Sequence, residues 1–314
     1  MARVQVVIPT RNRPSLLAEA VASALAQGPE VDRVFVVNDG EPIPEFVLPS
    51  DPRVRVIPNL GSGGAPGARN TGLAEVRTPW VVFLDDDDQL DETWVNTLLT
   101  AAERHGDQDV VLLASGFRIR GADGSLRERR PSVGHMDTAN LLVANTVGPT
   151  SFSLCRVEAV KAIGGFDEGL AAAQDWDLWI RLSERGTLIG IPEILGTYRI
   201  HAGEQISASC VTVRYVRHLP FYRKRDRHPR ASEVRKEWAS ETYWWGVLLA
   251  WTGDVRGAVA AFERALRYRP GHFKSRAMLC WVQTPFRKIV LRAIYGTRKD
   301  RIWFEDRREP LPLR

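Results

Sequence analysis

Short β-branched, apolar runs alternate with helical stretches through the first 115 residues of this 314-residue chain. The predicted strands are 4–8, 33–37, 54–57, 79–84 and 109–115, and the predicted helices are 15–27, one that begins near residue 65, and 92–105. Ser15 is the expected N-cap of the first helix, and Gly28 its expected end. Alternation at this spacing predicts an α/β fold with a mainly parallel sheet that helices cover on both faces.

The strongest single feature is four consecutive carboxylates, which we call the acidic run: Asp85, Asp86, Asp87 and Asp88. Four adjacent negative charges repel one another, and a hard divalent cation such as Mg²⁺ or Mn²⁺ relieves that repulsion. The run directly follows a predicted strand, and in α/β sheets ligands bind beyond the carboxyl ends of the strands. The alternative is an exposed acidic turn that caps the following helix. Asp39 ends another predicted strand, where it could accept hydrogen bonds from a base or ribose, or merely stabilise a turn.

A glycine-rich stretch precedes the helix that begins near residue 65. Gly61, Gly63 and Gly64 permit close approach of the backbone to a ligand, and Arg69 in the helix can balance phosphate charge. The spacing matches neither a P-loop nor a dinucleotide-binding fingerprint. The stretch therefore favours an anionic ligand without specifying a known phosphate motif.

A second informative block surrounds Asp175, at the start of a predicted helix. Asp175 could present a general base to a cleft or cap its helix, and spacing alone does not separate these roles. Asp177 and Arg181, four residues apart, are expected to pair across one turn. His201 follows a predicted strand at 187–198, and it is a candidate metal ligand only if the acidic run already holds a metal.

The chain changes character near residue 210. Residues 1–210 carry 19 Lys and Arg against 28 Asp and Glu, whereas residues 211–314 carry 24 against 10 and hold six of the ten tryptophans. We therefore predict two domains, 1–210 and 211–314, the second being helical at 233–251, 255–268 and 273–295. A tetratricopeptide-like hairpin is predicted from Gly246, Ala258, Phe262, Ala265 and Pro270. A basic, Trp-rich region suits a membrane surface or a polyanion, and a solvated basic face is the alternative.

Composition excludes several classes of protein. With 25 Gly and 19 Pro, the chain is neither collagenous nor wholly disordered. No apolar run reaches about 18 residues, so neither a membrane span nor a signal-peptide core is expected. Three widely spaced cysteines fit neither a disulfide framework nor a metal knuckle, which favours a reducing, cytoplasmic location. No zinc finger or RNA-binding motif is present, so no nucleic-acid partner is expected.

Seven segments, taken in order, resemble the family 2 glycosyltransferases of the GT-A fold. They are 7–13 (VIPTRNR), 36–40 (VVNDG), 68–72 (ARNTG), 83–88 (FLDDDD), 164–168 (GGFDE), 175–181 (DWDLWIR) and 198–201 (YRIH). The resemblance covers about residues 1–207. It implies a GT-A, Rossmann-like domain that uses a nucleoside-diphosphate sugar and a divalent cation, Mn²⁺ or Mg²⁺. Two departures, Gln174 where relatives carry an acidic residue and Glu41 where Ser is common, leave the donor open.

The resemblance also implies roles for individual residues. Asp39 contacts the base, Arg69 lies by the diphosphate, and Asp175 corresponds to the catalytic base. The metal site consists of Asp85 and Asp87 as the DxD pair, with Asp87 the expected direct ligand, and His201. The remaining donor-binding positions are Pro9, Thr10, Arg11, Arg13, Gly64 and Asp86, with Asp85 shared between donor and metal.

The predicted reaction is an inverting transfer of a sugar to an acceptor hydroxyl on a glycan, a lipid-linked sugar or a small glycoside, as in polysaccharide biosynthesis. Two alternatives stay open: a sugar-phosphate nucleotidyltransferase, and a non-catalytic scaffold that uses the basic helical tail. Peripheral contact with the inner face of a membrane through 273–301 is a further hypothesis, and so is a homo-oligomer. Residues 116–150, rich in Arg and Gly, are expected to cover the acceptor site.

Overall fold

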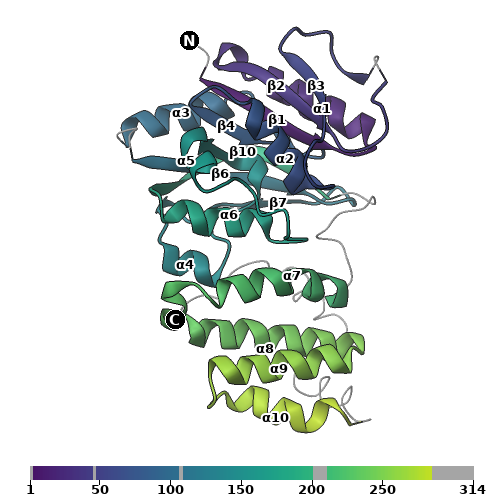
Figure 1. Ribbon diagram of the computed structural model, residues 1–314, viewed down its shortest axis with the longest axis vertical. Coiled ribbons are helices and arrows are strands. Elements are labelled where there is room, and N and C mark those ends of the chain that lie inside the picture. The colour runs from purple at the N-terminus through teal and green to yellow at the C-terminus, as the bar shows by residue number, and fades with distance from the viewer. Residues whose placement is uncertain (1–2, 45–46, 106–108, 201–210, 285–314) are drawn as a thin grey trace. The chain divides into compact units, whose positions relative to one another are not determined.

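The computed structural model describes residues 3–44, 47–105, 109–200 and 211–284 (Figure 1). Internal contacts divide the chain into two units, Met1–Leu141 with Asn145–Gly203, and Leu142–Ala144 with Glu204–Arg314. The first unit is built on a sheet and the second on helices. None of the described helices is long and apolar enough to cross a membrane.

The first unit contains a ten-stranded mixed sheet within the described residues. Along its main path the order is β3 (Val54–Pro58), β2 (Val31–Asn38), β1 (Val4–Thr10), β4 (Trp80–Phe83), β9 (Ser153–Arg156), β6 (Val110–Arg120), β10 (Thr187–Arg199) and β5 (Gln89–Leu90). The short strands β7 (Leu126–Arg129) and β8 (Gly134–His135) pair with β6 and β10. The predicted strands are confirmed, and β9 was not predicted.

Strand directions divide the sheet. The neighbours β3, β2, β1 and β4 are parallel, and so are β6 and β10. The strand β9 lies between these groups and is antiparallel to both β4 and β6. Because β1, β2 and β4 run the same way, their carboxyl ends, and the polar residues that follow them, meet at one edge of the sheet.

Helices cover both faces of the sheet, as predicted. On one face, α1 (Pro14–Leu25) and α3 (Trp94–Arg104) pack against Val4, Val6 and Ile8 of β1 in a single buried cluster. On the other face lies α2 (Ala65–Glu75), whose Gly72 is so close to Val7 that a Cβ there would lie 2.3 Å from the Val7 Cγ1 atom. The alternation of β1 residues between the two faces follows from the two-residue period of a strand.

The start of α1 differs from the expectation. Arg13 rather than Ser15 occupies the N-cap position, and Pro14 is the first helical residue. Proline is favoured there because its fixed φ suits a helix and its missing N–H would have no intrahelical partner. The helix ends at Leu25, and Gly28, with φ +78°, begins a short 3₁₀ turn (Gly28–Glu30).

Three short α-helices lie between β8 and β10 in the sequence. They are α4 (Thr138–Val143), α5 (Val157–Ala162) and α6 (Gln174–Ser183). Of these, α6 carries the block around Asp175, and α4 falls inside the stretch that was expected to cover the acceptor site.

The second unit consists of α7 (Val211–Arg225), α8 (Arg235–Thr252), α9 (Val255–Tyr268) and α10 (Phe273–Val282). The helices α8 and α9 pack closely, since a Cβ at Gly246 would lie 2.5 Å from a ring carbon of Phe262. The predicted helices at 233–251 and 255–268 are confirmed, and the one at 273–295 is described only as far as 284. Ala258 and Ala265 are buried but Pro270 is exposed, and the tetratricopeptide assignment stays a prediction.

Leu142, in α4, belongs to the helical unit and accepts two hydrogen bonds from it. Its carbonyl oxygen accepts from Arg225 Nη1 at 3.2 Å and from Trp238 Nε1 at 2.7 Å. Arg225 is buried, with its guanidinium carbon 4.4 Å from the centre of the Trp238 ring. A cation that faces an aromatic ring and donates to carbonyl oxygens satisfies much of its charge without water.

Candidate active site

The ends of β1 and β4 are joined by a side-chain hydrogen bond. Thr10, the last residue of β1, donates from Oγ1 to Asp86 Oδ2 at 2.7 Å. Its carbonyl oxygen accepts from the backbone N–H of Asp39, which follows β2, at 2.9 Å. Three parallel strands therefore bring Thr10, Asp39 and the acidic run together, as the rule for strand ends predicts.

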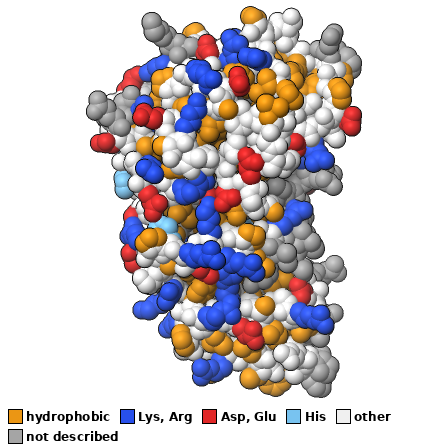
Figure 2. Space-filling model, viewed as in Figure 1, with side chains coloured by type: hydrophobic (Ala, Val, Ile, Leu, Met, Phe, Trp, Pro, Cys, Tyr) orange, Lys and Arg blue, Asp and Glu red, His pale blue; other side chains and the backbone are white. Residues whose placement is uncertain are grey.

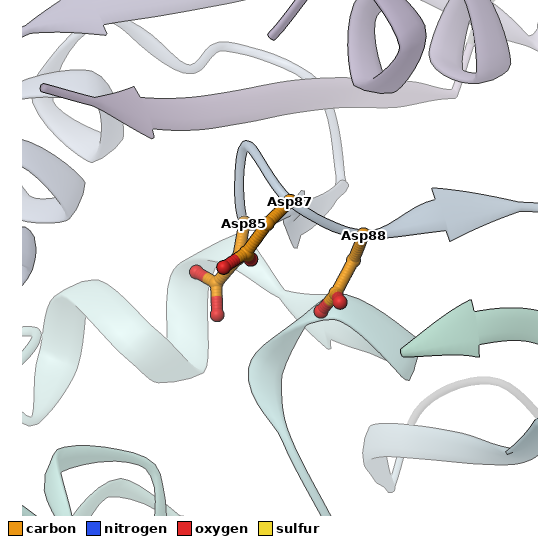
Figure 3. A group of neighbouring side chains, drawn as sticks. All are labelled: Asp85, Asp87 and Asp88. Carbon is orange, nitrogen blue, oxygen red and sulfur yellow. The ribbon is translucent and has the colours of Figure 1, made fainter. Parts of the chain in front are cut away.

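Three carboxylates of the acidic run form a cluster. Asp85, Asp87 and Asp88 each offer one oxygen, and these oxygens lie within 4.8 Å of one another. Figure 3 shows that all three side chains come from the connection between β4 and β5, with the carboxyl groups of Asp85 and Asp87 side by side. Because oxygen ligands at such spacing suit Mg²⁺ or Mn²⁺, the cluster can hold a divalent cation.

Asp88 is the most deeply buried member of this cluster. Its carboxylate accepts from Ser151 Oγ at 2.5 Å and from the backbone N–H of Arg199 at 3.3 Å. Burial raises the pKa of Asp88 well above its ordinary value, and the neighbouring charges of Asp87 and Asp85 raise it further. A cation would offset this unfavourable buried charge, so the donor set fits a metal. The metal ligands expected from the sequence were Asp85, Asp87 and His201, and Asp88 was not among them.

Asp86 points elsewhere. Besides the bond from Thr10, its carboxylate lies 3.1 Å from Arg13 Nη1. Burial raises the pKa of Asp86, while the Thr10 hydrogen bond and the Arg13 charge oppose this shift. Asp86 is therefore held by Thr10 at the end of β1 and by Arg13 just after it, and it is not one of the three clustered carboxylates.

Three arginines contact the acidic run. Arg13 Nη1 lies 3.2 Å from Asp87 Oδ2, and Arg69 Nη2 forms a short ion pair with Asp85. Arg199, at the end of β10, donates from Nε to the Asp87 carbonyl oxygen at 2.5 Å. These cations partly offset the negative charge of the run. His201, the other predicted metal ligand, lies outside the described residues.

Arg69 connects the acidic run to α6. Its Nη1 lies 3.4 Å from Gln174 Oε1, the first residue of α6, while its Nη2 contacts Asp85. The side chain is buried, its guanidinium lies over the Phe166 ring at 5.2 Å, and its Nε has no hydrogen-bond partner. A buried donor without a partner requires an explanation, and an ion or water bound at this position would provide one.

Asp39 is held by the glycine-rich loop. Its carboxylate accepts from the backbone N–H of Gly64 at 2.7 Å and from Asn59 Nδ2 at 2.7 Å. Gly64 has φ +100° and precedes α2, a conformation that L-residues with side chains rarely adopt. Asn59 was not singled out from the sequence. It directly follows β3, so the strand-end rule that selected Asp39 could also have selected Asn59.

The GGFDE segment anchors the same loop from the other side. Glu168 accepts from the Ser62 backbone N–H at 2.9 Å and from Asn70 Nδ2 at 2.8 Å, and these bonds lower its pKa. Asn70 also accepts from the Phe166 backbone N–H at 2.8 Å. Gly165 has φ +70°, and a Cβ there would lie 2.4 Å from Asn70 Oδ1, so only glycine fits.

Asp175 is the second residue of α6, and Ala173 occupies the N-cap position. The interpretation of Asp175 as the N-cap of α6 is therefore wrong. Its Oδ1 accepts from the backbone N–H of Trp176 at 2.8 Å, and its Oδ2 accepts from Asn145 Nδ2 at 3.0 Å. Burial raises the pKa of Asp175, and the Trp176 N–H and the Arg69 charge oppose this shift. Asn145, from the stretch expected to cover the acceptor site, was not identified from the sequence.

Two described residues of this region have a left-handed backbone conformation although they are not glycine. Among the described residues, Asn12 and Ala173 are the non-glycine residues with positive φ, each at +57°. A left-handed conformation costs an L-residue about 1–2 kcal/mol. Asn12 lies in the loop after β1 and Ala173 two residues before Asp175, and such strain commonly clusters at functional sites.

The remaining predicted donor positions lie on or next to β1. Pro9 is buried in the strand, whereas Arg11 is exposed in the loop that follows it. Together with Thr10 and Arg13, these positions form one continuous segment beside the acidic run.

Comparison with known proteins identifies the family. Residues 5–164 match the family model described as Glycosyl transferase family 2, which is about half of the chain. The chain belongs to glycosyl transferase family 2.

A relative within the curated proteins supports this assignment. The pre-mycofactocin glycosyltransferase of Mycobacterium tuberculosis is 33% identical over 194 residues, which cover 58% of this chain and 39% of that protein. The match thus spans about two fifths of the relative's length.

Solved structures share the fold of this family 2 chain at low identity. TarS 1–349 of S. aureus, in complex with UDP-GlcNAc, aligns with a TM-score of 0.58 and 15% identity over 96% of this chain and 92% of that chain. The mannosyltransferase PcManGT of Pyrobaculum calidifontis, in complex with GDP-Man and Mn²⁺, aligns with a TM-score of 0.57 and 15% identity over 96% and 83%. The GT-A-like fold and the helical C-terminal region are therefore confirmed.

Proposed function

We propose that the chain is an inverting, metal-dependent glycosyltransferase that moves a sugar from a nucleoside-diphosphate sugar to an acceptor hydroxyl. The observation that carries this proposal is the position of Arg69, between Asp85 of the acidic run and Gln174, which precedes Asp175. A metal-binding cluster and a candidate base are thus linked through one buried cation.

The proposed donor site lies along the carboxyl ends of β1, β2 and β4. Asp39, fixed by Asn59 and Gly64, would accept hydrogen bonds from the base, with 9–13 and Asp86 beside it. Arg69 would supply positive charge for the diphosphate, and its Nε–H group has no hydrogen-bond partner within the protein. The donors named for the two structural neighbours, UDP-GlcNAc and GDP-Man, make a nucleoside-diphosphate sugar the ligand class to test.

Asp87, Asp85 and Asp88 would hold Mn²⁺ or Mg²⁺, and the family resemblance adds His201. A bound cation would offset the negative charge that develops on the departing nucleoside diphosphate. The protein contributes oxygen ligands on a short connection between two strands, and Ser151 and Arg199 fix the buried Asp88.

Asp175 would accept the proton of the acceptor hydroxyl as that hydroxyl attacks the anomeric carbon. A base must be ionised before it accepts a proton, and burial raises the pKa of this carboxyl. Activity should therefore fall as pH decreases through a value above that of an ordinary aspartate. Attack opposite the leaving group in a single displacement inverts the anomeric configuration.

Turnover and stereochemistry test this proposal. Asp175→Asn should lower turnover by about 10²–10⁴-fold, as for loss of a general base, while donor binding persists. Glu184→Gln, an exposed position just after the same helix, is the control and should leave turnover unchanged. Near-normal turnover of Asp175→Asn, or NMR detection of a product with retained configuration, would contradict the proposal.

We also propose that the helical unit contacts an anionic membrane surface on the cytoplasmic side, where a lipid-linked or glycan acceptor would be presented. Residues 211–284 carry 15 Lys and Arg against 6 Asp and Glu. Figure 2 shows basic side chains gathered over α7 and α8 on the visible face. On α10, Phe273 is 80% exposed and Trp281 is 48% exposed, and both lie near one helical face beside Lys274. Exposed aromatics flanked by basic residues favour membrane surfaces.

A further inference from the structure

Asn145 forms a hydrogen-bonded turn directly beside Asp175. Its Oδ1 accepts from the Gly148 backbone N–H at 3.0 Å, and its Nδ2 donates to the Gly148 carbonyl oxygen at 3.3 Å. Gly148 has φ +112°, so the turn depends on glycine at this position. The same Nδ2 donates to Asp175 Oδ2 at 3.0 Å, and the turn therefore fixes the direction of this donor.

Two indole groups of α6 hold the same segment. Trp179 Nε1 donates to the Gly148 carbonyl oxygen at 2.9 Å, and Trp176 Nε1 forms a short bond to the Leu141 carbonyl oxygen. Trp179 is fully buried, whereas Trp176 is partly buried. The segment 141–148 is thus fixed at both ends to the helix that carries Asp175.

Each oxygen of Asp175 consequently accepts one hydrogen bond from a fixed donor. Oδ1 accepts from the Trp176 backbone within α6, and Oδ2 accepts from Asn145, 30 residues earlier in the sequence. Two such bonds set the plane of the carboxylate. Hydrogen bonds to the charged form also favour ionisation, so the Asn145 bond opposes the increase in pKa that burial causes.

We propose that Asn145 is a positioning residue that orients the Asp175 carboxylate. This inference rests on the proposed role of Asp175 as the base. Asn145 acts through Asp175 and does not itself accept the proton of the acceptor. Its loss should therefore change turnover and the pH dependence of turnover more than the binding of the sugar donor.

Asn145→Asp is the sharpest variant, because it has the same shape and keeps an oxygen to accept from Gly148. It replaces the donor by a second carboxylate, and two like charges in contact raise the pKa of one of them. In the plot of turnover against pH, the decrease at acidic pH should move to higher pH by about one unit or more. At a given pH within that decrease, turnover should then be about tenfold lower than in the wild type. Activity should recover at high pH, and the donor KM should stay within about twofold.

Asn145→Ala removes the donor without adding charge, so it should lower turnover with a smaller shift of the pH profile. Asn96→Asp, at an exposed position on α3, controls for an added negative charge. Thermal unfolding of each variant shows whether it is folded. An Asn145→Asp enzyme that is folded and keeps the wild-type pH profile would overturn the inference. Full activity of Asp175→Asn would instead overturn the proposed function itself.

Discussion

Thr10 and Asp86 are 76 residues apart in the sequence, yet Thr10 Oγ1 lies 2.7 Å from Asp86 Oδ2. This bond joins the ends of two neighbouring parallel strands, β1 and β4. Asp86 is not one of the three aspartates, Asp85, Asp87 and Asp88, whose oxygens lie close enough together to share one cation. We therefore expect Asp86 to serve a different role from the other three aspartates, and variants can test this.

Asp87→Asn should weaken the binding of Mn²⁺ in the absence of any nucleotide. Loss of supporting groups around a metal site costs about 10- to 100-fold in affinity, and loss of a direct ligand should cost at least as much. Electron paramagnetic resonance of free Mn²⁺ measures this directly. Asp86→Asn is the matched control within the acidic run. An equal loss of Mn²⁺ affinity in both variants would contradict the expectation that Asp86 lies outside the metal site.

Asp39→Ala should weaken binding of nucleoside diphosphates and raise the donor KM with little change in turnover. Loss of a hydrogen bond to a charged group costs about 1.5–3 kcal/mol, equivalent to roughly 10- to 150-fold in affinity. Asn59→Ala should have a smaller effect in the same direction, because Asn59 would act on the nucleotide through Asp39, to which it donates a hydrogen bond. Calorimetric titration measures both. Asp123→Ala, an exposed turn residue, should bind like wild type.

His272 should make the stability of the helical unit depend on pH. Its Nδ1 accepts from the Ser275 backbone N–H at 3.3 Å at the start of α10, and burial lowers its pKa, with smaller contributions from Arg269 and Lys274. The unfolded chain then binds a proton more readily than the folded one. Stability should therefore be fully present above the ordinary histidine pKa of about 6.5 and decrease as pH falls below it.

Thermal unfolding at pH 7.5 and pH 5.5 checks this prediction. His272→Asn keeps a capping oxygen but cannot titrate, so the histidine-linked part of the difference between the two pH values should disappear. His105→Asn replaces an exposed histidine and should leave that difference unchanged. An undiminished pH dependence in His272→Asn would show that other groups cause it.

Replacing both exposed aromatics of α10, by Phe273→Ser and Trp281→Ser, should reduce co-sedimentation of the full chain with anionic vesicles. Each side chain contributes aromatic area to the bilayer interface, while the basic residues attract the lipid charge. Vesicles with and without phosphatidylserine separate the two contributions. The matched control is Leu126→Ser with Val133→Ser, which removes two exposed apolar side chains from the first unit. Equal sedimentation of both double variants would contradict membrane contact through α10.

Local patterns predicted the parts of the fold that depend on local periodicity. The strands at 4–8 and 79–84, the helix that begins near residue 65, the helix at 255–268 and the polar residues at strand ends follow from apolar spacing and turn residues. The family match confirms the family resemblance. It also leaves the sugar-phosphate nucleotidyltransferase without support.

Long-range pairings could not be predicted in this way. The strand β9 enters the sheet between β4 and β6 and is antiparallel to both, which depends on contacts far apart in the sequence. Which of the four aspartates faces the others depends on a tight turn, in which the Asp88 N–H donates to the Asp85 carbonyl oxygen at 3.1 Å. Asn145 meets Asp175 only through the folded segment 141–148. A sequence pattern contains none of these distances.

The most direct test of the central claim is a thermal-shift screen of UDP, GDP, dTDP, ADP and CDP, each with and without Mn²⁺ or Mg²⁺. A ligand that binds only the folded protein raises its stability in proportion to ln(1 + [L]/Kd). We predict a metal-dependent increase in Tm for one nucleotide, which Asp87→Asn abolishes. Folded protein that shows no shift with any of the five nucleotides would contradict the account of the acidic run as a donor-binding metal site.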